Sequence, residues 1–322
     1  MTHSSSSAPA AVAGRSAPRL LRFVAIGACL PYLGLKVAWI AGSHLGIPAG
    51  SPLLEHRLPL ALANGLTVLM DACVVVLALL LTRPWGRRVP AWLLAVPMWT
   101  ATGLLAPIMV GFPLQLLVRS GVPGGSGGGD DRAFLDDWVF GVVYGGFIVQ
   151  GLALGTLFAG YAQRRWGRLW RGRAGELPAP ATAPAQRLTA LTALLLALVP
   201  GGLRLLWAAG STAGLDGSTD RLLEVVHLLF LVAAGTGAWQ LAFRRGRALP
   251  VTVPLVLAWA GSGATACWGG WMTLSTLVMA GDPAGGPTPA MSLTYAVQMI
   301  VGFLVATLVA RYFADRSAEE PR

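Results

Sequence analysis

Charged residues are scarce in this chain, and their scarcity excludes most soluble folds. Only 12% of the 322 residues are charged, whereas 55% are apolar. A soluble domain ordinarily carries about 25% charged residues. The apolar residues also form long blocks rather than the dispersed pattern of a soluble core. The composition therefore predicts an all-α, polytopic helical bundle that faces lipid.

Lysine and cysteine are nearly absent as well. Lys36 is the single lysine, so the net charge of +10 comes almost entirely from arginine. Because those arginines flank apolar blocks, they favour a role in membrane orientation over nucleic-acid binding. The three cysteines, Cys29, Cys73 and Cys267, all lie inside apolar blocks. Because the number of cysteines is odd and all of them lie in apolar blocks, a disulfide framework or a thiolate metal site is not expected.

Eight apolar blocks are long enough to cross a bilayer, which needs about 20 residues per helix. The first block runs too long for a signal peptide and contains Lys36, so we interpret it as an uncleaved span. The predicted spans are residues 20–43, 60–82, 89–110 with an extension to 117, 138–161, 188–209, 222–243, 249–272 with an extension to 279, and 293–313.

The distribution of arginine predicts which loops are cytoplasmic. With the N-terminus inside, most arginines lie in inner segments: Arg15, Arg19, Arg22, Arg83, Arg87, Arg88, Arg164, Arg165, Arg168, Arg171, Arg173, Arg187, Arg244, Arg245, Arg247, Arg311, Arg316 and Arg322. The acidic residues of the outer loops are Glu55, Asp130, Asp131, Asp136, Asp137, Asp216, Asp220 and Asp282. By the positive-inside rule, both termini are predicted to be cytoplasmic in a bacterial plasma membrane.

The two halves of the chain resemble each other. Residues 34–43 align with 202–211, and residues 86–90 align with 246–250. In the last two spans of each half, Trp99 matches Trp259, Gly103 matches Gly263, Tyr144 matches Tyr295, Gly151 matches Gly302 and Tyr161 matches Tyr312. Four spans per copy would make the repeats parallel, related by an axis along the membrane normal.

This internal match predicts five segments. They are a disordered cytoplasmic N-terminus at residues 1–18, a first four-span repeat at 19–166, a cytoplasmic linker at 167–186, a second four-span repeat at 187–314, and a cytoplasmic tail at 315–322.

Five ionisable residues form a candidate intramembrane polar site, because charge within a membrane is unfavourable and often functional. Lys36 and Arg204 occupy matching positions, Glu224 and His227 begin the sixth span, and Asp71 lies deepest in the second. One hypothesis is that Lys36 and Arg204 bind an anion or act as gating groups, while Asp71 is a protonatable carboxylate and His227 a proton relay. The alternative is that Lys36 pairs with Asp71, and Arg204 with Glu224, only to neutralise charge and fix helix register.

No pattern indicates a metal, a cofactor or a catalytic centre. Glu224 and His227 share a helical face, but a dimetal site needs a second such pair. The sequence contains no HExxH, G-x-S-x-G or P-loop motif. An enzyme is therefore the least favoured class.

Two short elements carry a resemblance to other proteins. Arg83-Pro84-Trp85-Gly86 followed by Pro90 forms an RPWG-x-x-x-P element, and a Gly-Leu-Lys/Arg…Trp…Gly-Ser element occurs in both halves. Together they resemble uncharacterised multi-pass membrane proteins of actinobacteria. The resemblance implies an inner-membrane protein of the same architecture and no particular activity.

Two functional classes fit these features. A small permease-like protein, with a small molecule or ion as substrate, predicts that Asp71, Lys36 and Arg204 converge on a hydrated site between the repeats. A non-catalytic scaffold, assembly factor or partner subunit, acting on another membrane protein, predicts local pairing within each half and a dry centre packed with Gly and Ala. In both classes the main partner is the lipid bilayer, and nucleic acid is not expected.

Overall fold

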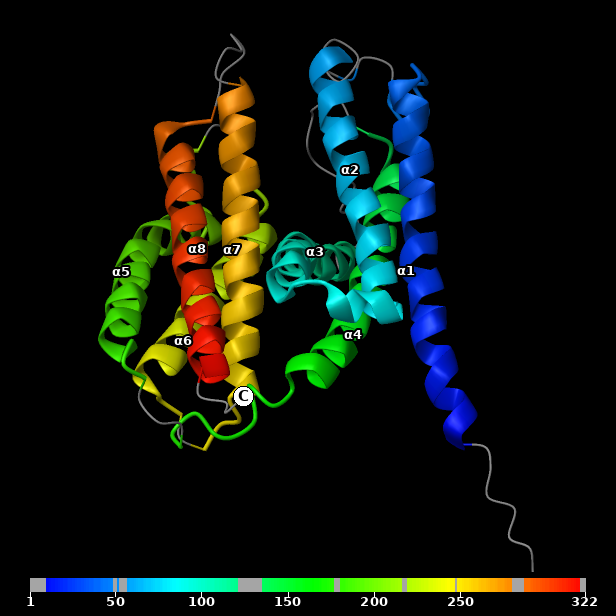
Figure 1. Ribbon diagram of the computed structural model, residues 1–322. Coiled ribbons are helices and arrows are strands. Elements are labelled where there is room, and N and C mark those ends of the chain that lie inside the picture. The colour runs from blue at the N-terminus through cyan, green and yellow to red at the C-terminus, as the bar shows by residue number, and fades with distance from the viewer. Residues whose placement is uncertain are drawn as a thin grey trace, which may run out of the picture. The chain divides into compact units, whose positions relative to one another are not determined.

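The chain folds into long helices (Figure 1). The computed structural model describes residues 10–48, 51, 57–120, 135–176, 180–215, 219–246, 248–279 and 287–318. The elements are α1 (Ala10–Ile40), α2 (Arg57–Thr82), the 3₁₀ turn η2 (Pro84–Arg88), α3 (Ala91–Ser120), α4 (Asp137–Trp166), α5 (Ala183–Ala208), α6 (Arg221–Phe243), α7 (Thr252–Met279) and α8 (Pro289–Ala318). The described part has no strand, which confirms the all-α class.

Each helix overlaps one of the eight apolar blocks, and α1 already includes residues 10–18. Several predictions concern residues outside the described ranges. They are the start of the N-terminus at 1–9, part of the linker at 177–179, the end of the tail at 319–322, and the loop residues Glu55, Asp130, Asp131, Asp216, Arg247 and Asp282.

Seven helices in the described ranges are long and apolar enough to cross a membrane, namely α1 to α6 and α8. The chain is therefore a multi-pass membrane protein. The lipid-facing character is clear on α5, where Leu188, Leu195 and Leu198 are 67%, 65% and 70% exposed. These leucines recur at helical spacing and form one apolar face of α5. Exposing such a face is unfavourable in water and favourable in the hydrocarbon of a bilayer.

The helix α7 is the exception, and its packing gives the reason. It carries no charged residue, but its many Gly, Ser, Thr and Trp residues lower its hydropathy. Residues 261–266 are all buried, so this stretch is covered by protein on every side. A helix surrounded by other helices needs less apolar surface than one that faces lipid.

The chain divides into two compact units. Unit 1 comprises residues 1–98 and 126–165, and unit 2 comprises residues 99–125 and 166–322. The boundary falls inside α3, so the second part of this helix packs with the C-terminal half of the chain. The predicted repeats therefore do not coincide with the compact units at this helix.

Small residues hold unit 2 together at close range. In Figure 1, α7 runs beside α8, and it also packs against α6. A Cβ added to Gly261 would overlap the backbone of Ala234 in α6, and one added to Gly302 would overlap that of Ala266 in α7. On a third side, a Cβ on Gly103 of α3 would overlap the backbone of Gly263. Such approaches let helices associate through van der Waals contact.

The helices α1 and α5 end in the same way, residue for residue. The indole Nε1 of Trp39 donates to the carbonyl of Leu45 at 2.8 Å, and Trp207 donates to Ala213 at 3.0 Å. Gly42 and Gly210 take left-handed φ values of 92° and 96°, which suit glycine at a helix C-terminus. These caps fix the ends of the two helices that carry Lys36 and Arg204.

Candidate functional site

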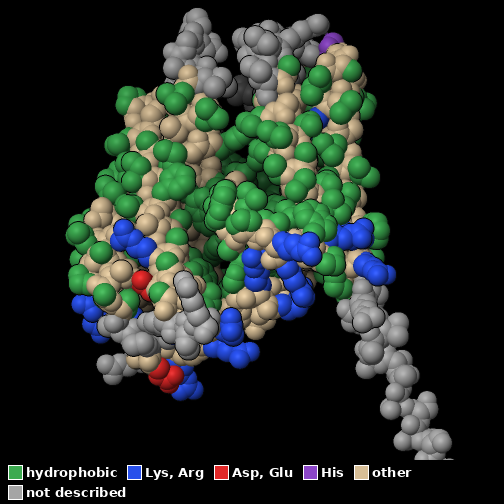
Figure 2. Space-filling view, in the orientation of Figure 1, with side chains coloured by type: hydrophobic (Ala, Val, Ile, Leu, Met, Phe, Trp, Pro, Cys, Tyr) green, Lys and Arg blue, Asp and Glu red, His purple; other side chains and the backbone are tan. Residues whose placement is uncertain are grey.

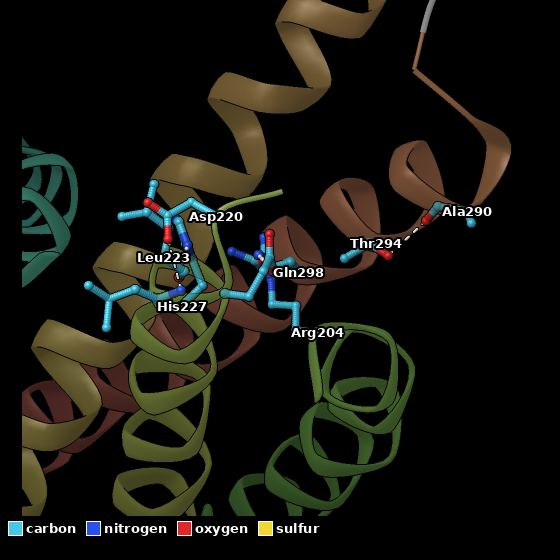
Figure 3. A network of polar contacts seen from close by, with 9 residues as sticks. Arg204, Asp220, Leu223, His227, Ala290, Thr294 and Gln298 are labelled. Carbon is cyan, nitrogen blue, oxygen red and sulfur yellow. Dashed lines mark hydrogen bonds and ion pairs between the residues drawn. The ribbon is translucent and has the colours of Figure 1, made fainter. Parts of the chain in front are cut away.

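The polar cluster of unit 2 is a complete hydrogen-bonded set. Arg204 in α5 donates from Nη1 to Glu224 Oε2 in α6 at 2.6 Å. Its Nε donates to Gln298 Oε1 in α8 at 2.8 Å, and Figure 3 shows these side chains meeting between the helices. All three residues are buried. The cluster therefore ties three helices of unit 2 together.

The energetics of this cluster are those of a buried ion pair. Arg204 is 3% exposed and Glu224 is 9% exposed, so each charge has lost nearly all its contact with solvent. Charge-assisted hydrogen bonds of this kind are short and strong, but removing one partner leaves the other uncompensated. The pairing of Arg204 with Glu224 is the structural alternative that the sequence suggests.

His227 lies one helical turn beyond Glu224 but makes its own contacts. Its Nδ1 is 2.8 Å from the carbonyl oxygen of Leu223. Because a carbonyl oxygen only accepts, Nδ1 must be the protonated nitrogen that donates. The ring also packs edge-on against Trp268, with centroids 5.6 Å apart. Through Nδ1, His227 is bound to its own helix.

The polar cluster of unit 1 is arranged differently. Lys36 in α1 is 1% exposed, and its Nζ has no hydrogen-bond partner among the residues that the structure describes. The ammonium lies 3.9 Å from the centroid of the Tyr32 ring, a cation–π contact. On α2, Asn64 Nδ2 and Asp71 Oδ2 are also buried and unpartnered within the described residues.

Helical spacing places these groups on facing sides of α1 and α2. Cys29, Tyr32 and Lys36 follow the i, i+3, i+7 pattern of one helical face of α1, and Asn64 and Asp71 lie seven residues apart on one face of α2. The helices α1 and α2 pack against each other. Lys36 and Asp71 are thus buried on two packed helices, and neither atom named above is hydrogen-bonded within the described residues.

Aromatic side chains form one side of the unit 1 cluster. The ring of Tyr32 meets Phe147 of α4 edge-to-face, with centroids 5.0 Å apart. Tyr144 lies next to Phe147, and both pack on a small apolar core that includes Leu35 and Val139. The Lys36 ammonium therefore lies beside an aromatic wall formed by Tyr32, Phe147 and Tyr144.

The internal alignment relates the two clusters position by position. Lys36 corresponds to Arg204 at an offset of 168, and Asn64 corresponds to Glu224 at the offset of 160 that aligns Gly86 with Gly246. Phe147 corresponds to Gln298 at the offset of 151 that aligns Tyr144 with Tyr295. Unit 2 thus has an acid and an amide where unit 1 has an amide and a phenyl ring.

The structure places the five predicted site residues in two clusters, each within one unit. Lys36 and Asp71 belong to unit 1, whereas Arg204, Glu224 and His227 belong to unit 2. Sequence reasoning missed Asn64 and Gln298, because it considered only ionisable side chains. Their signal was present, since each is a polar amide in an apolar block, and Asn64 also aligns with the site residue Glu224.

In the described ranges, no three His, Cys, Asp or Glu side chains lie close enough together to hold a metal ion. Comparison with known proteins adds no further assignment: no family model, no curated protein and no solved structure matches the chain.

Proposed function

We propose that the protein is a small permease-like membrane protein whose solute site lies in its first half, at Lys36, Asn64 and Asp71. One observation carries this proposal. Three buried polar atoms, Lys36 Nζ, Asn64 Nδ2 and Asp71 Oδ2, have no hydrogen-bond partner among the described residues. Leaving such atoms unsatisfied is unfavourable by about 1–3 kcal/mol each, and more for charged groups. A polar solute would supply the missing partners.

The chemistry of the three atoms suggests the class of solute. Lys36 and Asn64 present hydrogen-bond donors, whereas Asp71 presents an acceptor. A small carboxylate with an adjacent ammonium or hydroxyl group would accept from the first two and donate to the third. The nearby rings of Tyr32 and Phe147 would limit the size of the solute. The site would lie inside the first half rather than between the repeats.

We further propose that the chain is a duplicated eight-span bundle, with α7 as the eighth span and both termini cytoplasmic. The equal helix ends at Trp39 and Trp207 support this proposal. So does a reciprocal contact between α3 and α7: Trp99 Nε1 donates to Ser262 Oγ at 2.9 Å, and Trp259 Nε1 donates to Thr102 Oγ1 at 3.4 Å. Reciprocal contacts between matched residues are typical of a twofold relation.

A non-catalytic scaffold is the second candidate, and a specific observation favours it. Unit 2 has a locally paired polar cluster and a centre in which glycine backbones touch, as around Gly261 and Gly302. Such a dry, tightly packed centre suits a rigid partner subunit. In this reading the unit 1 atoms would be satisfied by internal water, and no solute would bind.

The two candidates differ in a thermal-shift experiment on the purified protein. Glycine, L-lactate, acetate and methylammonium would each be tested as single probes. We expect glycine or lactate to raise the apparent Tm more than acetate, and methylammonium to have no effect. A ligand at about 100 times its Kd stabilises the bound state by about 2.7 kcal/mol. If none of the four probes raises the Tm, the solute-binding proposal is contradicted and the scaffold is favoured.

Matched variants locate the response. Lys36→Met and Asp71→Asn should abolish the shift, whereas Gln298→Met, in the equivalent cluster of unit 2, should lower the Tm but keep the shift. A shift that survives Lys36→Met would place binding elsewhere. Uptake of the same solute into proteoliposomes then tests transport, since saturable binding without uptake would contradict a permease.

A further inference from the structure

The turn η2 lies at the surface of the membrane. It connects α2, whose apolar span ends at Thr82, to α3, whose span begins at Ala91. Only residues 83–90 separate the two spans, so none of them can extend far from the bilayer. The side chains of this connection are therefore held at the depth of the lipid headgroups.

The backbone of η2 is fixed by a buried clamp from α4. The Tyr161 hydroxyl, on a residue that is 4% exposed, donates to the carbonyl of Gly86 at 3.0 Å. Arg165 donates from Nη1 to the same carbonyl at 3.4 Å and from Nη2 to the carbonyl of Val89 at 2.8 Å. A Cβ on Gly86 would overlap the carbonyl of Leu80, so only glycine fits this approach. The turn is a rigid platform.

Basic and aromatic side chains project from this platform. Arg83, Arg87 and Arg88 are exposed, and Trp85 is 48% exposed beside them. Arg22 of α1 is 9% exposed, and its Nη1 donates to Thr82 Oγ1 at 3.5 Å, which brings a fourth guanidinium to this end of α2. On the face shown in Figure 2, basic side chains gather at this end of α1 and α2.

No acidic side chain of the described part of unit 1 neutralises this group. Asp71 lies 12 residues before Arg83, about 18 Å along α2 at 1.5 Å per residue. Asp136 and Asp137 are at the start of α4, whereas the clamp residues Tyr161 and Arg165 are near its end. Among the described residues, no ion pair to Arg83, Arg87 or Arg88 is found. The positive charge therefore has no acidic partner within the described part of this unit.

We propose that η2 is a binding site for the phosphate headgroup of an anionic phospholipid. Arginine guanidinium groups bind phosphate through paired N–H donors, and three on one rigid turn can share a single headgroup. Trp85 supplies the aromatic ring that prefers the interface between hydrocarbon and water. The depth of η2 selects a lipid over a soluble anion, because a headgroup is already present at that level. This proposal is independent of the solute site.

A lipid titration tests the proposal on the full-length protein in a neutral detergent. Bound phosphatidylglycerol would be counted by native mass spectrometry, with phosphatidylcholine and inorganic phosphate as comparison ligands. We expect saturable binding of phosphatidylglycerol only. The variant Arg83→Gln/Arg87→Gln/Arg88→Gln should weaken it about tenfold or more. Trp85→Ala should weaken it by a smaller factor without a change of charge.

A matched triple variant separates a built site from diffuse attraction. Arg164→Gln/Arg171→Gln/Arg187→Gln removes the same charge from exposed positions outside η2 and should leave phosphatidylglycerol binding unchanged. If the two triple variants lose phosphatidylglycerol binding equally, the proposal is overturned, because net charge alone would then explain the binding. Equal binding of phosphatidylcholine, or competition by inorganic phosphate, would overturn it as well. Each variant must elute as wild type on gel filtration, and Tyr161→Phe, which loosens the platform without altering its charges, should also weaken lipid binding.

Discussion

The polar clusters of the two units begin from matched basic residues and end in opposite states. In unit 2, the guanidinium group of Arg204 donates hydrogen bonds to the Glu224 carboxylate and to the Gln298 amide oxygen. All three polar groups are therefore paired within the fold. In unit 1, Lys36 has an aromatic face beside it and no hydrogen bond within the described residues. A buried basic residue thus holds helices together in unit 2, whereas the aligned residue in unit 1 has no hydrogen bond among the described residues.

The physical origin of the difference is a pair of neighbouring positions. The carboxylate of Glu224 compensates the charge of Arg204. The aligned residue Asn64 is neutral, and its buried Nδ2 donor has no partner among the described residues. Gln298 accepts a hydrogen bond, whereas the corresponding Phe147 cannot. Asp71 supplies the negative charge of unit 1 from a full two turns farther along α2. The arginine of unit 2 therefore has hydrogen-bonded partners, whereas the lysine of unit 1 has none among the described residues.

The largest expected effect is the loss of stability on breaking the unit 2 cluster. Arg204→Met leaves Glu224 buried without compensation, which should lower the free energy of unfolding by about 3–5 kcal/mol. The readout is the apparent Tm and the yield of monodisperse protein. The double variant Lys36→Met/Asp71→Asn, which removes both charges of unit 1, should be far milder. An equal decrease of the Tm in the two variants would contradict the claim that only the unit 2 cluster holds its helices together.

A smaller effect is expected at the contact between α3 and α7. A methyl group on Gly103 would collide with the backbone of Gly263, and overpacking of this kind is unfavourable by about 1–3 kcal/mol. Gly103→Ala should therefore lower the Tm. Gly145→Ala is the matched control, because nothing lies within 4 Å of a Cβ there. If Gly145→Ala lowers the Tm as much as Gly103→Ala does, the effect comes from replacing any helical glycine and not from the contact with Gly263.

The smallest effects concern the reciprocal tryptophan bonds. Trp99→Phe and Trp259→Phe each remove one hydrogen bond, worth about 0.5–1.5 kcal/mol. The loss should be larger at Trp99, whose bond to Ser262 is 2.9 Å, than at Trp259, whose bond to Thr102 is 3.4 Å. Chemical denaturation in mild detergent can resolve the order. The opposite order, or a loss confined to Trp259, would argue against the proposed twofold relation.

Much of the fold could be predicted from the sequence, because hydrocarbon imposes a simple rule on helix composition. All eight helices overlap the apolar blocks, and α6 spans Arg221–Phe243, within one residue of the predicted 222–243 at its start. The ends of other helices were less predictable. The helix α4 continues to Trp166, five residues beyond the predicted span, because Arg165 finds backbone acceptors on η2.

The candidate site was only partly predictable, because its hydrogen bonds depend on contacts between residues far apart in the sequence. The ion pair of Arg204 and Glu224 followed from opposite charges at similar depth. The roles of Gln298 and Asn64 did not, since a neutral amide gives no signal of whether its hydrogen bonds are met. The clamp of Tyr161 on Gly86 joins residues 75 positions apart, and no local pattern encodes such a contact. The division of α3 between two units depends equally on tertiary packing.

The most direct test of the account is the variant Asn64→Glu, which gives Lys36 the acid that Arg204 already has. The measurement is equilibrium binding of the solute that gives the largest thermal shift, together with the Tm of the unliganded protein. We predict a higher Tm, because a buried cation gains a charge-assisted hydrogen bond, and loss of solute binding, because Lys36 is then occupied. A variant that binds the solute as wild type does, or that fails to gain stability, would contradict the claim that unit 1 holds an open polar site.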